Sequence, residues 1–236
     1  MTATLVTGAG GVIGGALVRA LRERGHHVTT LTRTEGGDAT DPDAVARAAA
    51  GARTIFHLAP ADPSAVLTAG APRVVLASSV LVYGDAEGAL REDHTRADAR
   101  DGAIVARLTN TYGPGDLRPD RLVPTLQRAA RDGTSPRLRS DGSPARDFLH
   151  ADDAASALIA LAERGTPGEA YNIGTGVATP VRQVVALFER AVGRPLHPVY
   201  DEDDVDRSSR WADLTKITAT TGWRPAIALA DGLRRI

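Results

Sequence analysis

The feature that most constrains the fold of this chain is a glycine-rich turn near its N-terminus. Residues 4–7 form a short apolar run, Gly8, Gly11 and Gly14 follow it in G-x-x-G-x-x-G spacing, and a helical pattern comes next. A strand that ends in closely spaced glycines and opens a helix presents backbone N–H groups and a positive helix N-terminus to a pyrophosphate. A tight turn beside a close-packed helix is the simpler alternative, but the order of strand, turn and helix favours a dinucleotide site.

Length and charge narrow the class of protein. A chain of 236 residues can bury a sizeable core, either as one large α/β domain or as such a domain with a small attached lobe. Its 28 basic and 29 acidic residues give a formal net charge of -1, so there is no basic excess to hold a nucleic-acid backbone. No apolar run approaches the roughly 18 residues of a membrane span, and no leader pattern is visible. We therefore expect a cytoplasmic protein with no nucleic-acid or membrane partner.

Thiol chemistry and a metal site are not expected. The chain contains no Cys, which excludes disulfides, a thiol nucleophile and Cys-ligated zinc. Its six His residues are scattered and show no metal-ligand spacing. Lys216 is the only lysine, so a mechanism that needs an active-site lysine has a single candidate.

The rest of the chain alternates strand patterns with helical patterns. Apolar strand patterns occur at residues 27–32, 54–59, 73–79, 103–108 and 170–174. Helical patterns occur at residues 12–24, 43–50, 121–131, 152–164 and 180–192. This alternation predicts an α/β fold with a doubly wound parallel sheet. Residues 60–72 leave room for only a short crossover helix, and the polar segment 85–101 has no apolar stripe, so we expect a loop there.

The end of the second strand bears on the choice of cofactor. In a Rossmann unit, an acidic residue at this place hydrogen-bonds the adenosine ribose of NAD. Here the residue is Arg33, which can instead pair with the 2′-phosphate of NADP, although a solvent-exposed arginine at a strand end is also a possible interpretation. The sequence therefore predicts NADP or NAD, with NADP slightly favoured.

A set of short motifs runs in order from one end of the chain to the other. They lie at residues 7–14, 56–59, 78–79 with 83–84, 107 with 110 and 112–115, 146–148, 171–174 and 222–225. In this order they resemble the extended short-chain dehydrogenase/reductase family, in its NAD(P)-dependent nucleotide-sugar epimerase/dehydratase branch. The resemblance implies a single Rossmann-type domain over residues 1–236, with a small substrate lobe mainly from residues 114–145 and 177–236, and a carbohydrate-like small-molecule substrate.

The resemblance also implies roles for individual residues. Gly8, Gly11 and Gly14 hold the cofactor pyrophosphate. Further cofactor contacts are implied for Asp38, Ala39, Leu58 and Ala59, and substrate contacts for Asn110, Arg121 and Arg146. Ser79 is implied as the catalytic hydroxyl, unless the backbone satisfies it at the strand end. The fork of Arg146 suits a diphosphate, unless it pairs with Asp147 or Asp152.

The main departure from the family concerns its proton donor, a Tyr followed four residues later by a Lys that lowers the pKa of the phenol. No tyrosine of this chain has a lysine at that spacing, and the pair would belong in the polar segment 85–101. The helix that would carry it is therefore expected to be missing, and with it the four-helix-bundle dimer usual in the family. Tyr83, Glu92 and His94 are the candidates to replace the donor, and we select Tyr83 beside Ser79.

A second departure lies near the C-terminus. An acidic run at residues 201–204 stands close to where the family often has a second diphosphate-binding arginine, and carboxylates there would repel a diphosphate. Arg207 and Arg210 are close enough in sequence to compensate. The substrate therefore stays undefined at this stage.

The function expected first is an NAD(P)(H)-dependent sugar-nucleotide-type epimerase, dehydratase or ketoreductase with a non-standard acid/base. The missing Tyr/Lys pair leaves two alternatives open. One is a non-catalytic dinucleotide-binding or regulatory protein, and the other is a lyase, cyclase or isomerase that uses the same fold without redox chemistry.

Overall fold

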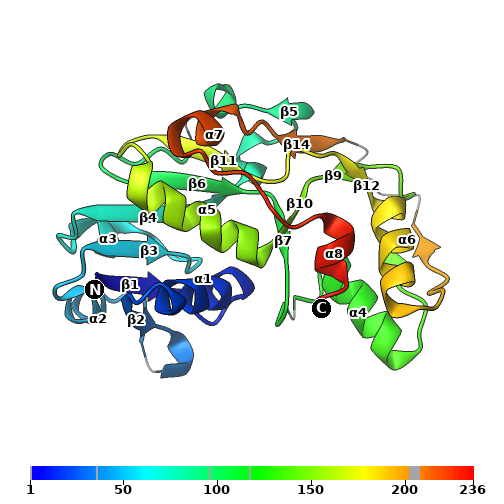
Figure 1. Cartoon of the computed structure of the whole chain (residues 1–236), viewed down its shortest axis with the longest axis horizontal. Coiled ribbons are helices and arrows are strands. Elements are labelled where there is room, and N and C mark those ends of the chain that lie inside the picture. Colours follow the sequence, from blue (N-terminus) through cyan, green and yellow to red (C-terminus); the bar gives the residue numbers. More distant parts are fainter. Residues whose placement is uncertain (1, 36, 96, 117, 202–207) are drawn as a thin grey trace.

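A six-stranded parallel sheet stands at the centre of the larger part of the molecule in the computed structural model, which describes residues 2–35, 37–95, 97–116, 118–201 and 208–236 (Figure 1). Its strands are β1 Ala3–Thr7, β2 His27–Leu31, β3 Thr54–His57, β4 Arg73–Ser79, β6 Ile104–Leu108 and β11 Ala170–Ile173. They lie in the order β11-β6-β4-β3-β1-β2, and every neighbouring pair is parallel. The predicted doubly wound α/β fold is confirmed, with the order reversing between β1 and β3.

Helices cover both faces of this sheet. On one face, α1 Val12–Glu23 packs along α5 Ala151–Arg164 over a core that includes Leu17, Phe56 and Leu158 (Figure 1). On the other face, α2 Pro42–Ala49 and the five-residue α3 Ser64–Thr68 cover a smaller core. The short α3 is the abbreviated crossover that residues 60–72 predict. Strand side chains alternate between the two cores because their direction has a period of two residues.

The connection from β4 to β6 contains no α-helix among its described residues. It consists of the 3-10 turn η2 Val80–Tyr83, the short strand β5 Gly88–Leu90 and the 3-10 turn η3 Glu92–His94. The predicted loop at residues 85–101 is thus confirmed in outline. The sequence did not reveal how a polar segment could cover a sheet face that a helix covers in the family.

A buried arginine fastens this segment to the sheet. Arg107 lies on β6 and points away from the core that its neighbours Ala106 and Leu108 join. Its guanidinium forms an ion pair with Asp98 at 2.6 Å and donates to the Tyr83 hydroxyl at 2.8 Å. It also donates to the carbonyl oxygens of Glu92 and Thr95. A guanidinium has five N–H donors, so one side chain can hold the whole segment.

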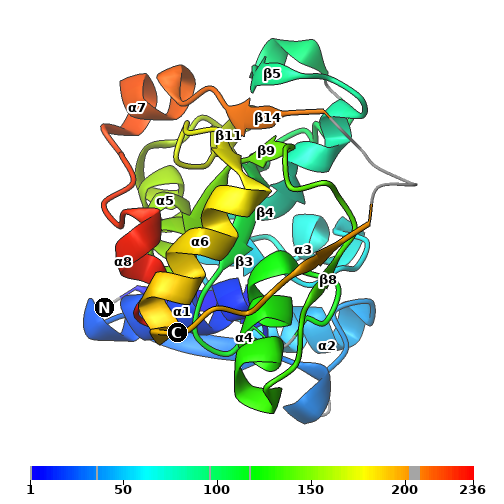
Figure 2. The same cartoon turned by 90° about the vertical axis from the view of Figure 1, so that its right-hand side faces the viewer.

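A second core lies beside the sheet (Figures 1 and 2). It is formed mainly by α4 Leu122–Asp132, α6 Val181–Val192 and α8 Leu229–Leu233. Strand β7 Asn110–Tyr112 pairs with β10 Phe148–His150 between this core and the sheet, while β8 Arg137–Leu138 pairs with β13 Val199–Tyr200 at its outer side. The short α7 Thr215–Thr221 lies beside β11, back at the edge of the large sheet.

Four short strands form a further sheet that the sequence did not predict. Its order is β12-β9-β14-β5, with β12 Thr179–Pro180, β9 Ala145–Arg146 and β14 Arg210–Ala212. Arg146 and Arg210 are register partners in it. Strand β14 also pairs with β5, so the polar segment after β4 is joined to the C-terminal part of the chain.

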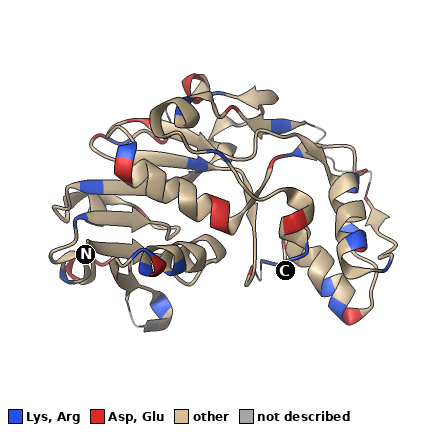
Figure 3. Cartoon of the chain, in the orientation of Figure 1, with Lys and Arg blue, Asp and Glu red and all other residues tan. Residues whose placement is uncertain are grey.

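Two further observations concern the distribution of charged residues and the character of the helices. Basic and acidic residues are interspersed over both parts of the molecule (Figure 3). Within the described residues, no helix combines the length and the apolar character needed to cross a membrane.

Candidate active site

The glycine turn after β1 is shaped by two close backbone approaches. Gly8 has a φ of +70°, and a Cβ there would lie 2.6 Å from the Ala59 nitrogen. A Cβ on Gly14 would collide with the Gly8 carbonyl oxygen and would lie 2.7 Å from the Ala9 Cα. Gly11 is the N-cap of α1 and is sterically less restricted, since a Cβ there would meet only the Gly8 oxygen at 3.4 Å.

The start of α1 suits an anion. Its first turn contains no acidic residue, and no side chain caps it. The N–H groups of a helix start and the helix dipole both attract negative charge, so these residues fit the pyrophosphate of a dinucleotide. The three glycines that the sequence singled out are the residues that would hold it.

A buried histidine fixes the neighbouring strand end. The His57 Nε2 lies 3.0 Å from the carbonyl oxygen of Ala61, which can only accept, so Nε2 donates. The His57 Nδ1 forms a hydrogen bond with the Thr7 hydroxyl at 2.9 Å. The Leu58 backbone nitrogen donates to the Thr7 carbonyl oxygen at 3.2 Å, which places Leu58 and Ala59 against the glycine turn. The sequence does not single out His57, because the apolar pattern of residues 54–59 indicates only a buried strand.

The residues expected near the adenosine follow β2. Arg33 begins the 3-10 turn η1 Arg33–Glu35 and is exposed. Asp38 accepts hydrogen bonds from the backbone and hydroxyl of Thr40, both at 2.8 Å, and these bonds lower the pKa of its carboxyl together with the nearby charge of Arg33. The adjacent Ala39 is buried.

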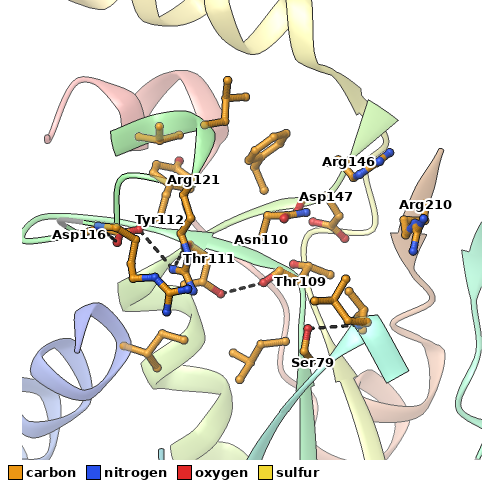
Figure 4. A pocket seen from close by; sticks show the side chains of 18 of the residues that line it. Ser79, Thr109, Asn110, Thr111, Tyr112, Asp116, Arg121, Arg146, Asp147 and Arg210 are labelled. Atoms are coloured by element: carbon orange, nitrogen blue, oxygen red, sulfur yellow. Dashed lines mark hydrogen bonds and ion pairs between the residues drawn. The ribbon is translucent and has the colours of Figure 1, made fainter. Parts of the chain in front are cut away.

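A pocket of about 500 Å³ opens at the carboxyl ends of β4 and β6, between the sheet and the second core (Figure 4). The candidates Ser79, Asn110, Arg121 and Arg146 all line it. Thr109, Asp116, Asp147 and Arg210 line it as well. In Figure 4, Asp116 and Arg121 lie on one side, Arg146, Asp147 and Arg210 lie on the other, and Ser79 lies below. Ligands of open parallel sheets bind at this end of the strands.

Ser79 is the last residue of β4, and its hydroxyl is available to donate a hydrogen bond. The Ser79 oxygen accepts from the Leu81 nitrogen at 3.2 Å, which satisfies one of its lone pairs. Within the described part of the chain, its proton is donated to no other group. The hydroxyl can therefore donate to a ligand oxygen while the backbone holds it in place.

Tyr83 has a different environment. Its hydroxyl donates to the Asn172 side-chain oxygen at 2.7 Å and accepts from Arg107, and burial raises its pKa. It is not among the residues that line the pocket. Glu92 and His94 are also engaged elsewhere, the former with the Asn172 nitrogen and the latter with the Arg91 nitrogen. The geometry does not favour Tyr83 as the proton donor.

The arginines on β9 and β14 are held by backbone groups. Arg146 donates to the carbonyl oxygens of Ala145 and Ser208, and Arg210 donates to the Gly84 oxygen at 2.8 Å. Sequence reasoning had considered Arg210 only as a compensating charge, and its place in the pocket depends on the unpredicted sheet. Arg207 lies outside the described residues.

The carboxylates of the pocket lining all have donors. Asp147 accepts from Thr175, Gly176 and Ala212, and burial raises its pKa while these donors act in the opposite direction. Asp116 accepts from Arg121, and Asp120 accepts from Arg118. Asp152, the other suggested partner of Arg146, forms an ion pair with Arg19. Every described carboxylate of the lining is thus engaged.

Known proteins share this architecture. A family model described as "NAD dependent epimerase/dehydratase family" matches residues 4–65 and 92–174, so that the first part of the connection without a helix, residues 80–91, falls between the two matches. A solved structure described as "MoeE5 in complex with UDP-glucose and NAD" is 30% identical with a TM-score of 0.83, and the match covers 98% of this chain and 96% of that one.

Two curated proteins illustrate the range of relatives. The dTDP-glucose 4,6-dehydratase of Streptomyces griseus is 37% identical over 131 residues, which cover 55% of this chain and only 40% of that protein. The 2-alkyl-3-oxoalkanoate reductase of Stenotrophomonas maltophilia (strain K279a) is 30% identical over 254 residues, covering 81% of this chain and 76% of that protein. With the family model matching more than half of its residues, the chain belongs to the NAD-dependent epimerase/dehydratase family.

Proposed function

We propose that the chain is an enzyme that uses NAD or NADP to epimerise, dehydrate or reduce a nucleotide-linked sugar. The observation that carries this proposal is the joint lining of one pocket by the Ser79 hydroxyl, Asn110 and the guanidinium groups of Arg121, Arg146 and Arg210. A hydroxyl at a strand end suits the reacting sugar oxygen, and the arginines suit the two phosphates. MoeE5, which is 30% identical, was solved with UDP-glucose and NAD.

The bound dinucleotide would supply a hydride acceptor or donor for one sugar carbon. Ser79 would hydrogen-bond the oxygen at that carbon and hold it in place. Arg121 and Arg146 would bind the diphosphate from opposite sides of the pocket, and the second core would form the substrate lobe from residues 114–145 and 177–236.

A non-standard acid/base is part of the proposal. The described carboxylates of the lining are engaged, and the Tyr83 hydroxyl faces Arg107 and Asn172. We therefore infer that Ser79 accepts the proton of a sugar hydroxyl while its own proton passes to water in the pocket. We also propose that the chain lacks the four-helix dimer of its family, because the short α3 is the only α-helix among the described residues between β3 and β6.

Replacement of Ser79 by alanine tests the catalytic assignment. We expect turnover to fall about a hundredfold or more, because a positioned proton-transfer group contributes on that order. The affinity for NAD should stay unchanged, and Ser79→Thr should keep most of the activity because it retains a hydroxyl. Conversion of a panel of UDP-, dTDP- and GDP-linked sugars, followed by the absorbance of the reduced nicotinamide and by product chromatography, measures this.

The same assay tests the proposed function as a whole. A wild-type protein that binds neither NAD nor NADP by calorimetry contradicts it. Tight dinucleotide binding without hydride exchange on any sugar of the panel would instead favour a non-catalytic dinucleotide-binding protein. Full turnover by Ser79→Ala would remove Ser79 from the catalytic scheme but leave the enzyme class standing.

Arg33 is proposed to favour NADP over NAD. Since a charge-assisted bond to a phosphate contributes about 1.5 to 3 kcal/mol, we expect Arg33→Ala to weaken NADP binding at least tenfold. NAD lacks the 2′-phosphate, so its affinity should change little. Calorimetric titration with both cofactors measures the difference, and Arg47→Ala, at an exposed position of α2, is the control. Equal losses for the two cofactors would argue against a 2′-phosphate contact.

A further inference from the structure

Arg121 lines the pocket, and among the described residues only one of its three nitrogens has a protein acceptor. Its Nη1 donates to the Thr111 carbonyl oxygen at 3.2 Å and to Asp116 Oδ2 at 3.3 Å. Within the described residues, its Nε and Nη2 donate to no acceptor. These two nitrogens form one edge of the planar fork, the edge that binds two oxygens of a phosphate at once. The bound nitrogen therefore decides where the free edge points.

Asp116 is the fixed member of this pair. Its side chain is 2% exposed, whereas that of Arg121 is 40% exposed. The Asp116 nitrogen donates to the Gly113 oxygen at 3.2 Å, and its Oδ1 accepts from the Arg118 nitrogen at 3.3 Å. The intervening Gly115 has a φ of +82°, a value that favours glycine. The backbone thus holds the carboxylate, and the arginine follows it (Figure 4).

The ion pair between Asp116 and Arg121 is poorly suited to stabilising the fold. A carboxylate loses much of its hydration when it is buried, and a cation that is 40% exposed returns only part of that loss. An apolar side chain of similar volume would serve the packing at least as well. The geometry points to a function: we propose that Asp116 is a positioning residue that aims the free edge of Arg121 at the diphosphate of the substrate. This inference rests on the proposed function.

The sign of one effect separates positioning from simple charge. Asp116 places a negative charge next to a site for phosphates, so Coulomb's law alone predicts that Asp116→Asn strengthens phosphate binding. Positioning predicts the opposite, since the neutral amide holds Nη1 less firmly and the fork loses its direction. Asp116→Glu keeps the negative charge but moves the carboxylate by one methylene. Charge alone therefore predicts little change in phosphate binding, whereas positioning predicts weaker binding.

The experiment is a calorimetric titration of UDP and of inorganic pyrophosphate into the full chain saturated with NAD. We expect Asp116→Asn and Asp116→Glu each to weaken binding of both probes about five- to tenfold. In turnover assays, KM for the nucleotide sugar should rise while kcat changes less than twofold. In an Arg121→Ala background, the Asp116 substitutions should have no further effect, because there is no fork left to aim. Asp132→Asn is the matched control, because Asp132 is bound to Arg131 at the C-terminal end of α4 and does not line the pocket, and it should stay within twofold of wild type.

Each outcome decides between named possibilities. Unchanged or tighter UDP binding by Asp116→Asn overturns the inference and leaves the proposed function intact, and so does an equal loss in the Arg121→Ala background. A wild-type protein that binds neither UDP nor pyrophosphate overturns the proposed substrate class and this inference with it. Thermal unfolding monitors the fold, and if Asp116→Asn does not fold, Asp116→Glu and Arg121→Lys, which keep both charges, decide in its place.

Discussion

Replacement of Gly14 by alanine is expected to destabilise the protein and to remove most of its affinity for NAD. Alanine normally stabilises a helix by about 1 kcal/mol relative to glycine. Here the new methyl group would collide with the Gly8 carbonyl oxygen and would lie 2.7 Å from the Ala9 Cα, and both are backbone atoms that cannot rotate away. We expect a net loss of about 1 to 3 kcal/mol, as for other overpacked positions. Because the displaced backbone is the proposed pyrophosphate cradle, NAD binding should fall with it.

Gly10 provides the matched control in the same turn. Its φ lies outside the positive region, and a Cβ there would have no neighbour within 4 Å. Gly10→Ala should therefore leave the free energy of unfolding within about 0.5 kcal/mol of wild type. Urea unfolding measures stability, and calorimetry measures NAD affinity. Wild-type stability in Gly14→Ala would show that the turn is more plastic than its geometry indicates.

Breaking the ion pair between Arg107 and Asp98 is expected to have the largest effect on stability. Arg107 is 1% exposed and Asp98 is 16% exposed, so Asp98→Ala leaves a buried guanidinium without its counter-ion. Removal of one partner of a buried pair costs about 3 to 5 kcal/mol. The double variant Asp98→Ala with Arg107→Met should recover part of this loss, because no charge stays behind. Asp93→Ala is the control, since Asp93 is 69% exposed in its pair with Arg91 and should cost less than about 1 kcal/mol.

The same pair gives stability a defined dependence on pH. Burial alone would raise the pKa of Asp98, but hydrogen bonds from Arg107 and Ser78 and the charge of Arg107 lower it on balance. An acid with a lowered pKa in the folded state contributes its full stabilisation above its unfolded pKa of about 3.9, and loses it as pH falls through the folded pKa. The stability gap between wild type and Asp98→Asn should thus narrow from pH 7 to pH 3 in urea unfolding. A gap of equal size at both pH values would mean that the carboxylate charge contributes nothing.

Much of the large sheet is predictable because its signals are local. The apolar runs at residues 54–59 and 73–79 have lengths typical of buried strands, and the glycine turn follows directly from its spacing. The network around Arg107 has no such signal. Its members come from β6, from β11, from η2 and from a polar segment without periodicity. Only the three-dimensional arrangement links them, with Arg107 donating to Asp98 and to the Tyr83 hydroxyl, and that hydroxyl donating to the Asn172 side chain.

The candidate site likewise contains residues whose position the sequence predicts and one, Tyr83, whose position it does not. Ser79, Asn110, Arg121 and Arg146 were selected by resemblance, and they come together in one pocket. Tyr83 is a candidate only as a substitute for the missing Tyr/Lys pair, and the direction of a side chain within a 3-10 turn cannot be read from the sequence. Its hydroxyl points to Asn172 instead. The roles of all these residues stay predictions until the variants are measured.

The four-stranded sheet β12-β9-β14-β5 has a consequence for the order in which the protein acquires its binding sites during synthesis. The large sheet is complete once residue 173 has left the ribosome, and the glycine turn is made much earlier. The wall that carries Arg146 and Arg210 must wait for residues 210–212, which close the loop between strands far apart in the chain. A nascent chain would thus complete the proposed dinucleotide site before the proposed sugar site, and a bound cofactor would be available to stabilise the incompletely synthesised protein.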